Sequence, residues 1–482
     1  MSHPNRTQVR DLHHHLLTER DRHVDHRAAI HRPPATDGPP GANRGPRTGP
    51  IRRIIAASRA TGLVGARALT MVVFGGDREH VITGSALLAF AFGWALLAVL
   101  SIRMTSQPQR WALVPAAGMA VTGLGLLVLA PGDGALTAAG WVWPPALLAL
   151  AIWMGFRVRR SLAAGSGRWA LYPVVAVMAA AAVGGAVETV VLASDARSYA
   201  MPRQSYDVGG YNLHLHCTGV GGPTVVLQSG LGGFSPSWAR VAPAVAGTTR
   251  VCVYDRAGQG WSDDAPRIQD GLQAAADLHT LLDRAGENGP FVLVGHSIGG
   301  SYAMTYAARY PEQVAGMVLL DATDPYQVTA TGKAADPSAP AEFAVLPSLA
   351  RLGIAQLFPS SFWSSLPEPA AGEFQAFASS PRGFQNMADE SAAMPALFSQ
   401  AQGLITLGST PLVVLTASGH DSDPGWSVAQ DRMAALSTNH SHRTADATHA
   451  ALLDEKKGAE ASALAIDAAV QAARTGAPLP PD

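Results

Sequence analysis

The chain has 482 residues, and its 35 basic and 36 acidic side chains leave a formal net charge of −1. This balance gives no reason to expect nucleic-acid binding, which depends on a basic surface. The length allows two or three domains. The composition changes along the chain, from a polar tail to long apolar segments and then to a globular mixture.

Residues 1–53 form the polar tail, which is rich in arginine, histidine and proline. It cannot bury enough apolar surface to fold alone, so we expect it to be disordered. No apolar core lies close to Met1, so we do not expect a secretory signal. The run His13–His15 is a weak candidate for metal binding, and a solvated tail is the simpler interpretation.

Four apolar segments in residues 54–193 are long enough to cross a bilayer as helices. They are Val81–Ile102, Trp111–Ala130, Ala138–Phe156 and Trp169–Ala193. Tryptophans at several of their ends fit the aromatic belt of a membrane interface. The fourth segment contains Glu188, which we expect to reach the interface.

A fifth crossing by Ile54–Phe74 is left open, because Arg59 and Arg67 interrupt that segment. Each arginine near a helix centre costs about 2.5–3.5 kcal/mol on insertion scales. The alternative is an amphipathic helix that lies on the membrane surface.

The loops between these segments differ in charge, which predicts an orientation. Loop 103–110 has two arginines and loop 157–168 has four, whereas loop 131–137 has none. Arginine-rich short loops stay in the cytoplasm. An arginine-rich tail on that same side then requires five crossings, and the chain emerges outside at a linker, 194–204.

From 205 to 475 apolar runs typical of strands alternate with helical stretches such as Gly271–Ala285. The expected strands are Thr224–Gln228, Arg250–Tyr254, Phe291–Val294, Met317–Leu320 and Pro411–Thr416. This alternation predicts an α/β fold with a mostly parallel sheet. An insertion at about 323–410, rich in proline and aromatic residues, predicts a helical cap, and 476–482 form a short tail.

Phe291–Gly300 contains the most informative motif, a strand-like run that leads into Gly-x-Ser-x-Gly. Such an order is typical of a nucleophile elbow, in which a sharp strand-to-helix turn exposes the serine, here Ser297. Gly295 and Gly299 let the chain fold tightly on either side. The alternative is a glycine-rich turn with no chemistry.

Other stretches supply what a nucleophilic serine needs. The strand and glycine-rich loop at Thr224–Gly233 would offer the backbone N–H of Leu231 to a developing oxyanion, with the N–H of Ile298 as the second donor. His449 precedes an apolar helix start and comes last in the chain order Ser…Asp…His, which suits a general base.

An acidic residue is needed to orient that histidine, and three candidates exist. Asp421 follows the strand Pro411–Ala417 and is the first choice. Asp423 is the second. Asp321, which ends the strand Met317–Asp321, is the third, because some hydrolases take the acid from that strand.

With these residues in place, residues 205–475 resemble the α/β-hydrolase superfamily, and within it the membrane-anchored hydrolases of actinobacteria. The stretches that carry the resemblance are Gly209–Cys217, Ser229–Gly233, Tyr254–Asp263, Gly295–Gly300, Leu319–Pro325 and the pair Asp421 and His449. The resemblance implies that Asp255 and Arg256 are structural and brace the loop beside the site. A nucleophilic aspartate, as in epoxide hydrolases and haloalkane dehalogenases, is not supported, because the elbow residue is serine.

Cys217 and Cys252 are the only cysteines. They lie on strands that are neighbours in the sheet of this superfamily, so a disulfide is geometrically plausible. It would fit an oxidising exterior. Two buried thiols are the alternative.

The sequence therefore predicts a membrane-anchored serine hydrolase that cleaves a carboxylic ester, with an external hydrolase domain. Ser297 attacks, His449 acts as base and then acid, and Asp421 orients His449. No cofactor or metal is expected; the expected partners are a small ester-like substrate with an apolar group and the lipid bilayer. An amide, peptide or thioester hydrolase, and a non-catalytic binding domain of this fold, are the alternatives. The substrate and the oligomeric state are left open.

Overall fold

The computed structural model describes residues 49–200, 204–326, 341–359, 361, 364–420 and 424–480. Most of the predicted tail, with His13–His15, lies outside the described residues. The predicted tail boundary at residue 53 is too late, because helix α1 (Gly49–Ala68) already begins at Gly49. Ile51, Ile54 and Ile55 recur at helical spacing and are buried against the other apolar helices, which holds this first turn in place.

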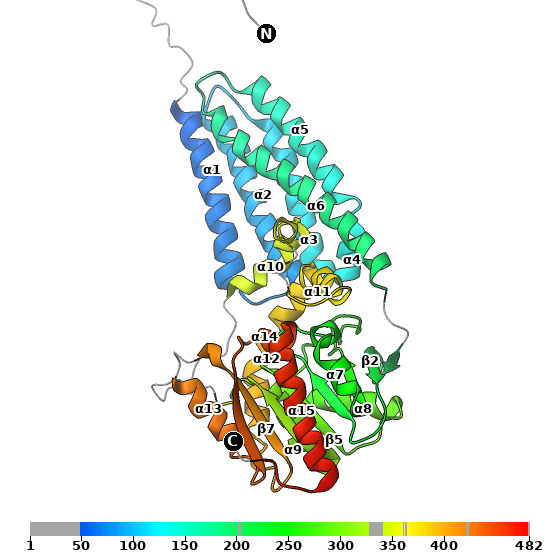
Figure 1. Cartoon of the computed structure of the whole chain (residues 1–482). Coiled ribbons are helices and arrows are strands. Elements are labelled where there is room, and N and C mark those ends of the chain that lie inside the picture. The colour runs from blue at the N-terminus through cyan, green and yellow to red at the C-terminus, as the bar shows by residue number, and fades with distance from the viewer. Residues whose placement is uncertain are drawn as a thin grey trace, which may run out of the picture. The chain divides into compact units, whose positions relative to one another are not determined.

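The N-terminal half of the described chain is a helical bundle (Figure 1). Its helices are α1, a short π-helical extension Leu69–Val73, α2 (Glu79–Met104), 3₁₀ turn Arg110–Ala112, α3 (Leu113–Leu129), α4 (Asp133–Ala139), α5 (Trp143–Ser161), 3₁₀ turn Arg168–Ala170 and α6 (Tyr172–Ser198). By length and composition α2, α3 and α6 can cross a membrane, and α4 with α5, bent by 48°, can make a fourth crossing. These match the four predicted segments. Helix α1 is not among them, so the fifth crossing stays a prediction.

Both arginine-bearing loops lie at the same end of the bundle. Gln109 in one loop accepts a hydrogen bond of 2.7 Å from Ser161 at the end of α5. A Cβ on Gly167 would lie 2.9 Å from the Arg52 side chain, so α1 begins at this end as well. The positions of these segments agree with the predicted five-crossing arrangement, in which loops and tail share one side.

Glu188 on α6, which the sequence predicted to lie at the interface, has a partner outside the bundle. Its side chain is buried, and its Oε2 accepts a hydrogen bond of 3.0 Å from Gln356, which belongs to the predicted cap. A carboxylate in an apolar helix needs such a partner, because an unpaired polar group is costly to bury. The sequence prediction missed this partner because the two residues are 168 positions apart.

The C-terminal half contains an eight-stranded sheet with the order β1-β2-β4-β3-β5-β6-β7-β8. The strands are β1 (Ser205–Asp207), β2 (Asn212–Thr218), β3 (Val225–Gln228), β4 (Val251–Tyr254), β5 (Phe291–His296), β6 (Val314–Leu320), β7 (Leu412–Ala417) and β8 (His440–Ala445). Strand β2 pairs antiparallel with β1 and β4, and all other pairings are parallel. The mostly parallel α/β sheet is therefore confirmed. Strand β8 was not predicted, because its sequence is polar.

Helices cover both faces of this sheet, as a parallel sheet requires. One face carries α8 (Gly271–Arg284) and α9 (Gly299–Arg309), and the other carries α7 (Val241–Ala246) and α15 (Lys456–Thr475). Successive residues of β5 alternate between the two cores: Leu293 packs on the first face, and Val292 and Val294 on the second. The shorter helices are α13 (Pro424–Ala434) and α14 (Ala451–Asp454), and the 3₁₀ turns are Ser235–Trp238, Pro311–Gln313 and Ser418–His420.

Helices fill the insertion between β6 and β7, where the cap was expected. They are the 3₁₀ turn Ala341–Val345, α10 (Leu346–Arg351), the 3₁₀ turn Ala355–Leu357, α11 (Ala370–Ala378) and α12 (Pro381–Ala401). Phe234, beside the loop that follows β3, stacks on Phe374 and meets Phe377 edge-on, with ring centroids 5.6 and 5.0 Å apart. Some cap aromatics therefore serve to pack the cap onto the domain below.

Cys217 and Cys252 are direct cross-strand partners in the antiparallel pair β2–β4. Their Cα atoms are 4.0 Å apart, and the two sulfurs are joined in a disulfide. The structure thus favours the disulfide over two buried thiols.

Protein purified without reductant should contain no free thiol. We expect alkylation under denaturing conditions to add no mass until the protein is reduced, and then to add two groups. Because the bond closes a loop with a sequence separation of 35 residues, replacing both cysteines by serine should lower the free energy of unfolding by about 2–4 kcal/mol. Two alkylated thiols before reduction would contradict the pairing.

Candidate active site

Ser297 occupies a strained turn between the end of β5 and the start of α9. Its φ is +57°, a left-handed conformation that residues other than glycine rarely adopt. The turn is held by its backbone: the N–H of Ser297 donates to Leu320, and its carbonyl accepts from Gly300 and Thr323. A Cβ on Gly295 would lie 2.4 Å from the Gly300 nitrogen, so only glycine fits there. This geometry is that of the predicted elbow.

The loop after β3 passes directly beside Ser297, as expected for an oxyanion site. A Cβ on Gly230 would lie 3.0 Å from the Cβ of Ser297. Among the described residues, the N–H groups of Leu231 and Ile298 donate to no protein acceptor. Both predicted donors therefore remain available to a ligand.

Arg256 and Glu390 fix this loop from behind. The buried guanidinium of Arg256 donates to the carbonyls of Ser229 and Gly230, at 2.7 and 2.8 Å. It also donates at 2.7 Å to Glu390 on α12, whose other oxygen accepts the N–H of Gly232 at 2.9 Å. Arg256 is thus a bracing residue, as the resemblance implied.

Asp255 has a similar bracing role. Its carboxylate accepts from the backbone N–H groups of Ser235 and Trp261, at 2.7 and 3.1 Å. The His214 ring lies 3.2 Å away, and both side chains are buried. These contacts tie the loop after β4 to the chain that follows the oxyanion loop.

His449 contacts a carboxylate, but the partner is Asp321. The distance from His449 Nδ1 to Asp321 Oδ2 is 2.6 Å, and Asp321 is fully buried. Its other oxygen accepts from the Ala417 N–H and the Trp426 indole, at 3.1 and 2.9 Å. Burial acts to raise the pKa of Asp321, but these hydrogen bonds outweigh it and hold the pKa below its ordinary value.

Among the described residues, Asp321 is the carboxylate that contacts His449, so the third candidate is the one that the structure supports. Because β6 and β7 are neighbours, the end of β6 lies beside the end of β7. All three candidate aspartates satisfy the chain order, and the sequence alone ranked Asp321 last. Asp421 and Asp423 lie outside the described residues.

His296 is a site residue that the sequence reasoning missed. Its Nε2 donates to the His449 carbonyl at 2.9 Å, and the two rings have centroids 4.4 Å apart. Burial and the neighbouring His449 lower the pKa of His296 to about 3, so it stays neutral at ordinary pH. It links the elbow to the His449 loop. Its place directly before Ser297 was the available signal.

One group in the described chain resembles a metal site and is better explained otherwise. Ligand atoms of Cys217, Cys252 and Glu287 lie within 4.8 Å of one another. The two sulfurs are bonded to each other, however, and Glu287 accepts hydrogen bonds from Arg250. This group is a disulfide beside an ion pair.

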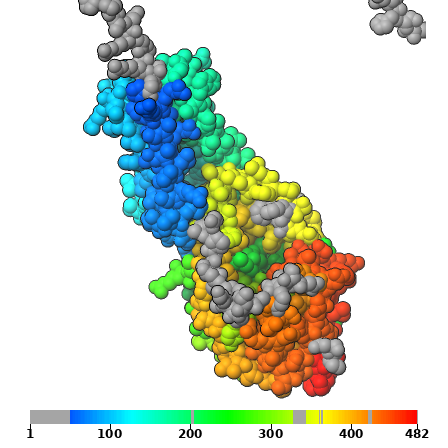
Figure 2. Space-filling view, turned by 90° about the vertical axis from the view of Figure 1, so that its left-hand side faces the viewer, coloured from blue at the N-terminus to red at the C-terminus, as the bar shows by residue number. Residues whose placement is uncertain are grey.

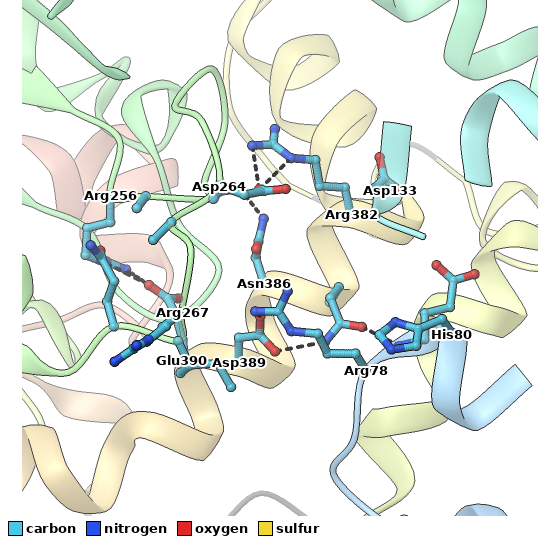
Figure 3. Close-up of a pocket in the computed structure, with 18 of the residues that line it drawn as sticks. Arg78, His80, Asp133, Arg256, Asp264, Arg267, Arg382, Asn386, Asp389 and Glu390 are labelled. Atoms are coloured by element: carbon cyan, nitrogen blue, oxygen red, sulfur yellow. Dashed lines mark hydrogen bonds and ion pairs between the residues drawn. The ribbon is translucent and has the colours of Figure 1, made fainter. Parts of the chain in front are cut away.

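A polar cavity of about 140 Å³ lies behind the oxyanion loop. Figure 3 shows its charged lining in pairs: Arg256 with Glu390, Arg382 with Asp264 and Arg78 with Asp389. Neither Ser297 nor His449 lines it. In Figure 2 a separate hollow opens between the yellow cap and the orange C-terminal part, with green atoms as its floor.

Several known proteins are similar to part of this chain. Residues 223–455 match a family model described as alpha/beta hydrolase fold. The uncharacterized protein C23C11.06c of Schizosaccharomyces pombe is 45% identical over 83 residues, which are 17% of this chain and 15% of that protein. A putative carbamate hydrolase RutD of Pseudomonas savastanoi pv. phaseolicola is 37% identical over 113 residues, 23% of this chain and 43% of its own length. The chain thus spans less than half of these relatives.

Among solved structures, a thermophilic esterase from Thermogutta terrifontis is 23% identical. The match covers 55% of this chain and 95% of the esterase, with a TM-score of 0.41.

Exchanging Asp321 for asparagine tests the identity of the acid. We expect Asp321→Asn to lower kcat for an activated ester by about three to four orders of magnitude, because His449 loses its charged partner. The matched control is the double variant Asp421→Asn/Asp423→Asn, which should keep kcat within about threefold. If the double variant lost activity while Asp321→Asn kept it, and both had unchanged circular dichroism, Asp421 or Asp423 would be the residue that orients His449.

Proposed function

We propose that the chain is a membrane-anchored serine hydrolase that cleaves a carboxylic ester, since residues 223–455 match the model of the alpha/beta hydrolase fold. The observation that carries the proposal is the strained Ser297 elbow together with the pair of His449 and the buried Asp321. Backbone strain of this kind persists where function requires it.

In the proposed mechanism Ser297 Oγ attacks the ester carbonyl while His449 Nε2 takes its proton. Asp321 stays ionised, since its pKa lies below the ordinary value, and stabilises the imidazolium. The N–H groups of Leu231 and Ile298 hold the oxyanion, each contributing about 3–4 kcal/mol. His449 then protonates the leaving alcohol, and water releases the acid from Ser297.

An ester is preferred over the alternatives because of the cap. Its aromatic and aliphatic side chains suit an apolar acyl or alcohol group. An amide, peptide or thioester would use the same machinery and stays an alternative. A non-catalytic binding domain would need neither a strained serine nor an ionised aspartate on a histidine.

The proposal places the hydrolase domain outside the cytoplasm. The arginine-bearing loops lie at one end of the bundle, and the Cys217–Cys252 disulfide suits an oxidising compartment. Helix α1 would then be the first crossing, with Arg59 and Arg67 within it.

A membrane-impermeant fluorophosphonate probe tests the activity and the sidedness together. We expect intact cells with the wild-type protein to be labelled, and cells with Ser297→Ala to stay unlabelled, because the probe needs an activated serine. Labelling only after lysis would support the serine hydrolase activity but place the hydrolase domain in the cytoplasm. No labelling after lysis would refute the serine hydrolase.

A further inference from the structure

The cap is fastened to the helical bundle by buried charges. Arg351 at the end of α10 pairs with Glu79 at 2.5 Å and with Asp133 at 2.8 Å. These carboxylates lie in the first turns of α2 and α4. Thr83 and Ser348 add a hydrogen bond of 2.6 Å. The cap therefore packs on the bundle as well as on the domain that it covers.

The segment Leu346–Leu357 also runs alongside α6. A Cβ on Gly184 would lie 2.1 Å from the carbonyl oxygen of Leu352, so the two backbones touch. One turn later, Glu188 accepts the hydrogen bond from Gln356. Gly184 precedes the end of the apolar segment at Ala193 by nine residues, or about 13 Å of helix. Along α6 the cap segment therefore lies about two turns before that end, while Arg351 meets the first residue of α2, Glu79.

This part of the cap exposes large apolar side chains. Leu357 is 81% exposed, Ile354 38% and Leu349 36%. The neighbouring stretch of α6 exposes apolar side chains too, Val183, Val187 and Val190. Because the two segments touch at Gly184 and Leu352, these exposed side chains lie on adjoining elements. Grouped apolar exposure of this kind marks an interaction surface.

Helix α12 connects the bundle with the oxyanion loop. On one side Gln385 accepts the N–H of Glu79 at 2.9 Å, and Asp389 lies 3.6 Å from Arg78. On the other side Glu390 binds the N–H of Gly232. Figure 3 shows Asp389 turned toward Arg78 and the next residue, Glu390, turned toward Arg256. A single helix, α12, therefore contacts both the oxyanion loop and the first turn of the apolar helix α2.

We propose, on the basis of the proposed esterase function, that the cap segment Leu346–Leu357 is embedded in the bilayer beside α6 and that the substrate is an ester of a membrane lipid. The occupant of the apolar surface is the acyl-chain region of the bilayer. The ester groups of membrane lipids lie between the headgroups and the hydrocarbon, a zone that begins where apolar helices end. A site that α12 connects directly to that point could meet such an ester without extracting the lipid into water.

The reaction is a hydrolysis, and its atoms balance with water as the only co-reactant. The Oγ of Ser297 bonds to the acyl carbon, the ester C–O bond breaks, and the serine proton passes through His449 to the leaving alcohol. Water then cleaves the acyl-serine bond. The products are a free carboxylic acid and the alcohol part of the lipid.

Fluorescence quenching tests the position of the cap. In full-length protein reconstituted in vesicles, Leu357→Cys labelled with an environment-sensitive fluorophore should be quenched by lipids with spin-labelled acyl chains and protected from aqueous iodide. Ile405→Cys is the matched control, since Ile405 is 84% exposed and lies outside the cap helices. Equal iodide quenching at both positions, without lipid quenching at 357, would overturn the embedding.

Two substrates in the same vesicles test the substrate class. We expect Leu357→Asp to lower turnover of a long-chain glycerolipid ester about tenfold or more, because a carboxylate is excluded from hydrocarbon. A short water-soluble ester should be hydrolysed within about twofold of wild type, and Ile405→Asp should change neither rate. Unchanged lipid turnover in Leu357→Asp, or equal loss with both esters, would overturn the proposal.

These results separate the further inference from the proposed function. The wild-type protein could hydrolyse the short ester and react with fluorophosphonate but leave lipid esters intact. That result would support the esterase function and contradict the lipid substrate. Wild-type protein that neither labels nor hydrolyses either ester refutes the esterase and, with it, the lipid substrate.

Discussion

The buried ion pair between Arg256 and Glu390 is the contact on which the reaction site depends. It joins the loop after β4, the oxyanion loop and the cap helix α12 through hydrogen bonds of 2.7–2.9 Å. Two charges removed from water are stable only when every remaining donor and acceptor is satisfied. The pair therefore fixes the geometry of three separate segments at once, including the loop that supplies the Leu231 N–H.

The same helix carries this geometry to the apolar bundle. Gln385 and Asp389 of α12 meet the start of α2, while Glu390 meets the oxyanion loop. A cap that only covered the site would need no such contacts. Because α12 is held on both sides, it has a fixed position over the site. A substrate must then reach Ser297 past the elements that surround α12.

Local signals in the sequence predicted the fold and the tight turn at Ser297. The elbow is a run of adjacent residues with fixed backbone demands, so Ser297 and the strand before it were read correctly. The strands with apolar runs were found, whereas β8 was missed because its side chains are polar. The choice among Asp321, Asp421 and Asp423 could not be made, because it depends on which strand ends meet in space.

Glu188 is a second residue whose partner could not be predicted from the sequence. The sequence gives a lone carboxylate in an apolar helix, and an interfacial position is the simplest way to satisfy it. In the structure one oxygen of Glu188 accepts a hydrogen bond from Gln356, a side chain from the other half of the chain. Because a buried carboxylate without a partner is expensive, α6 and the cap depend on each other. The bundle therefore does more than hold the protein in the membrane, because its contacts with the cap help to position the cap over Ser297.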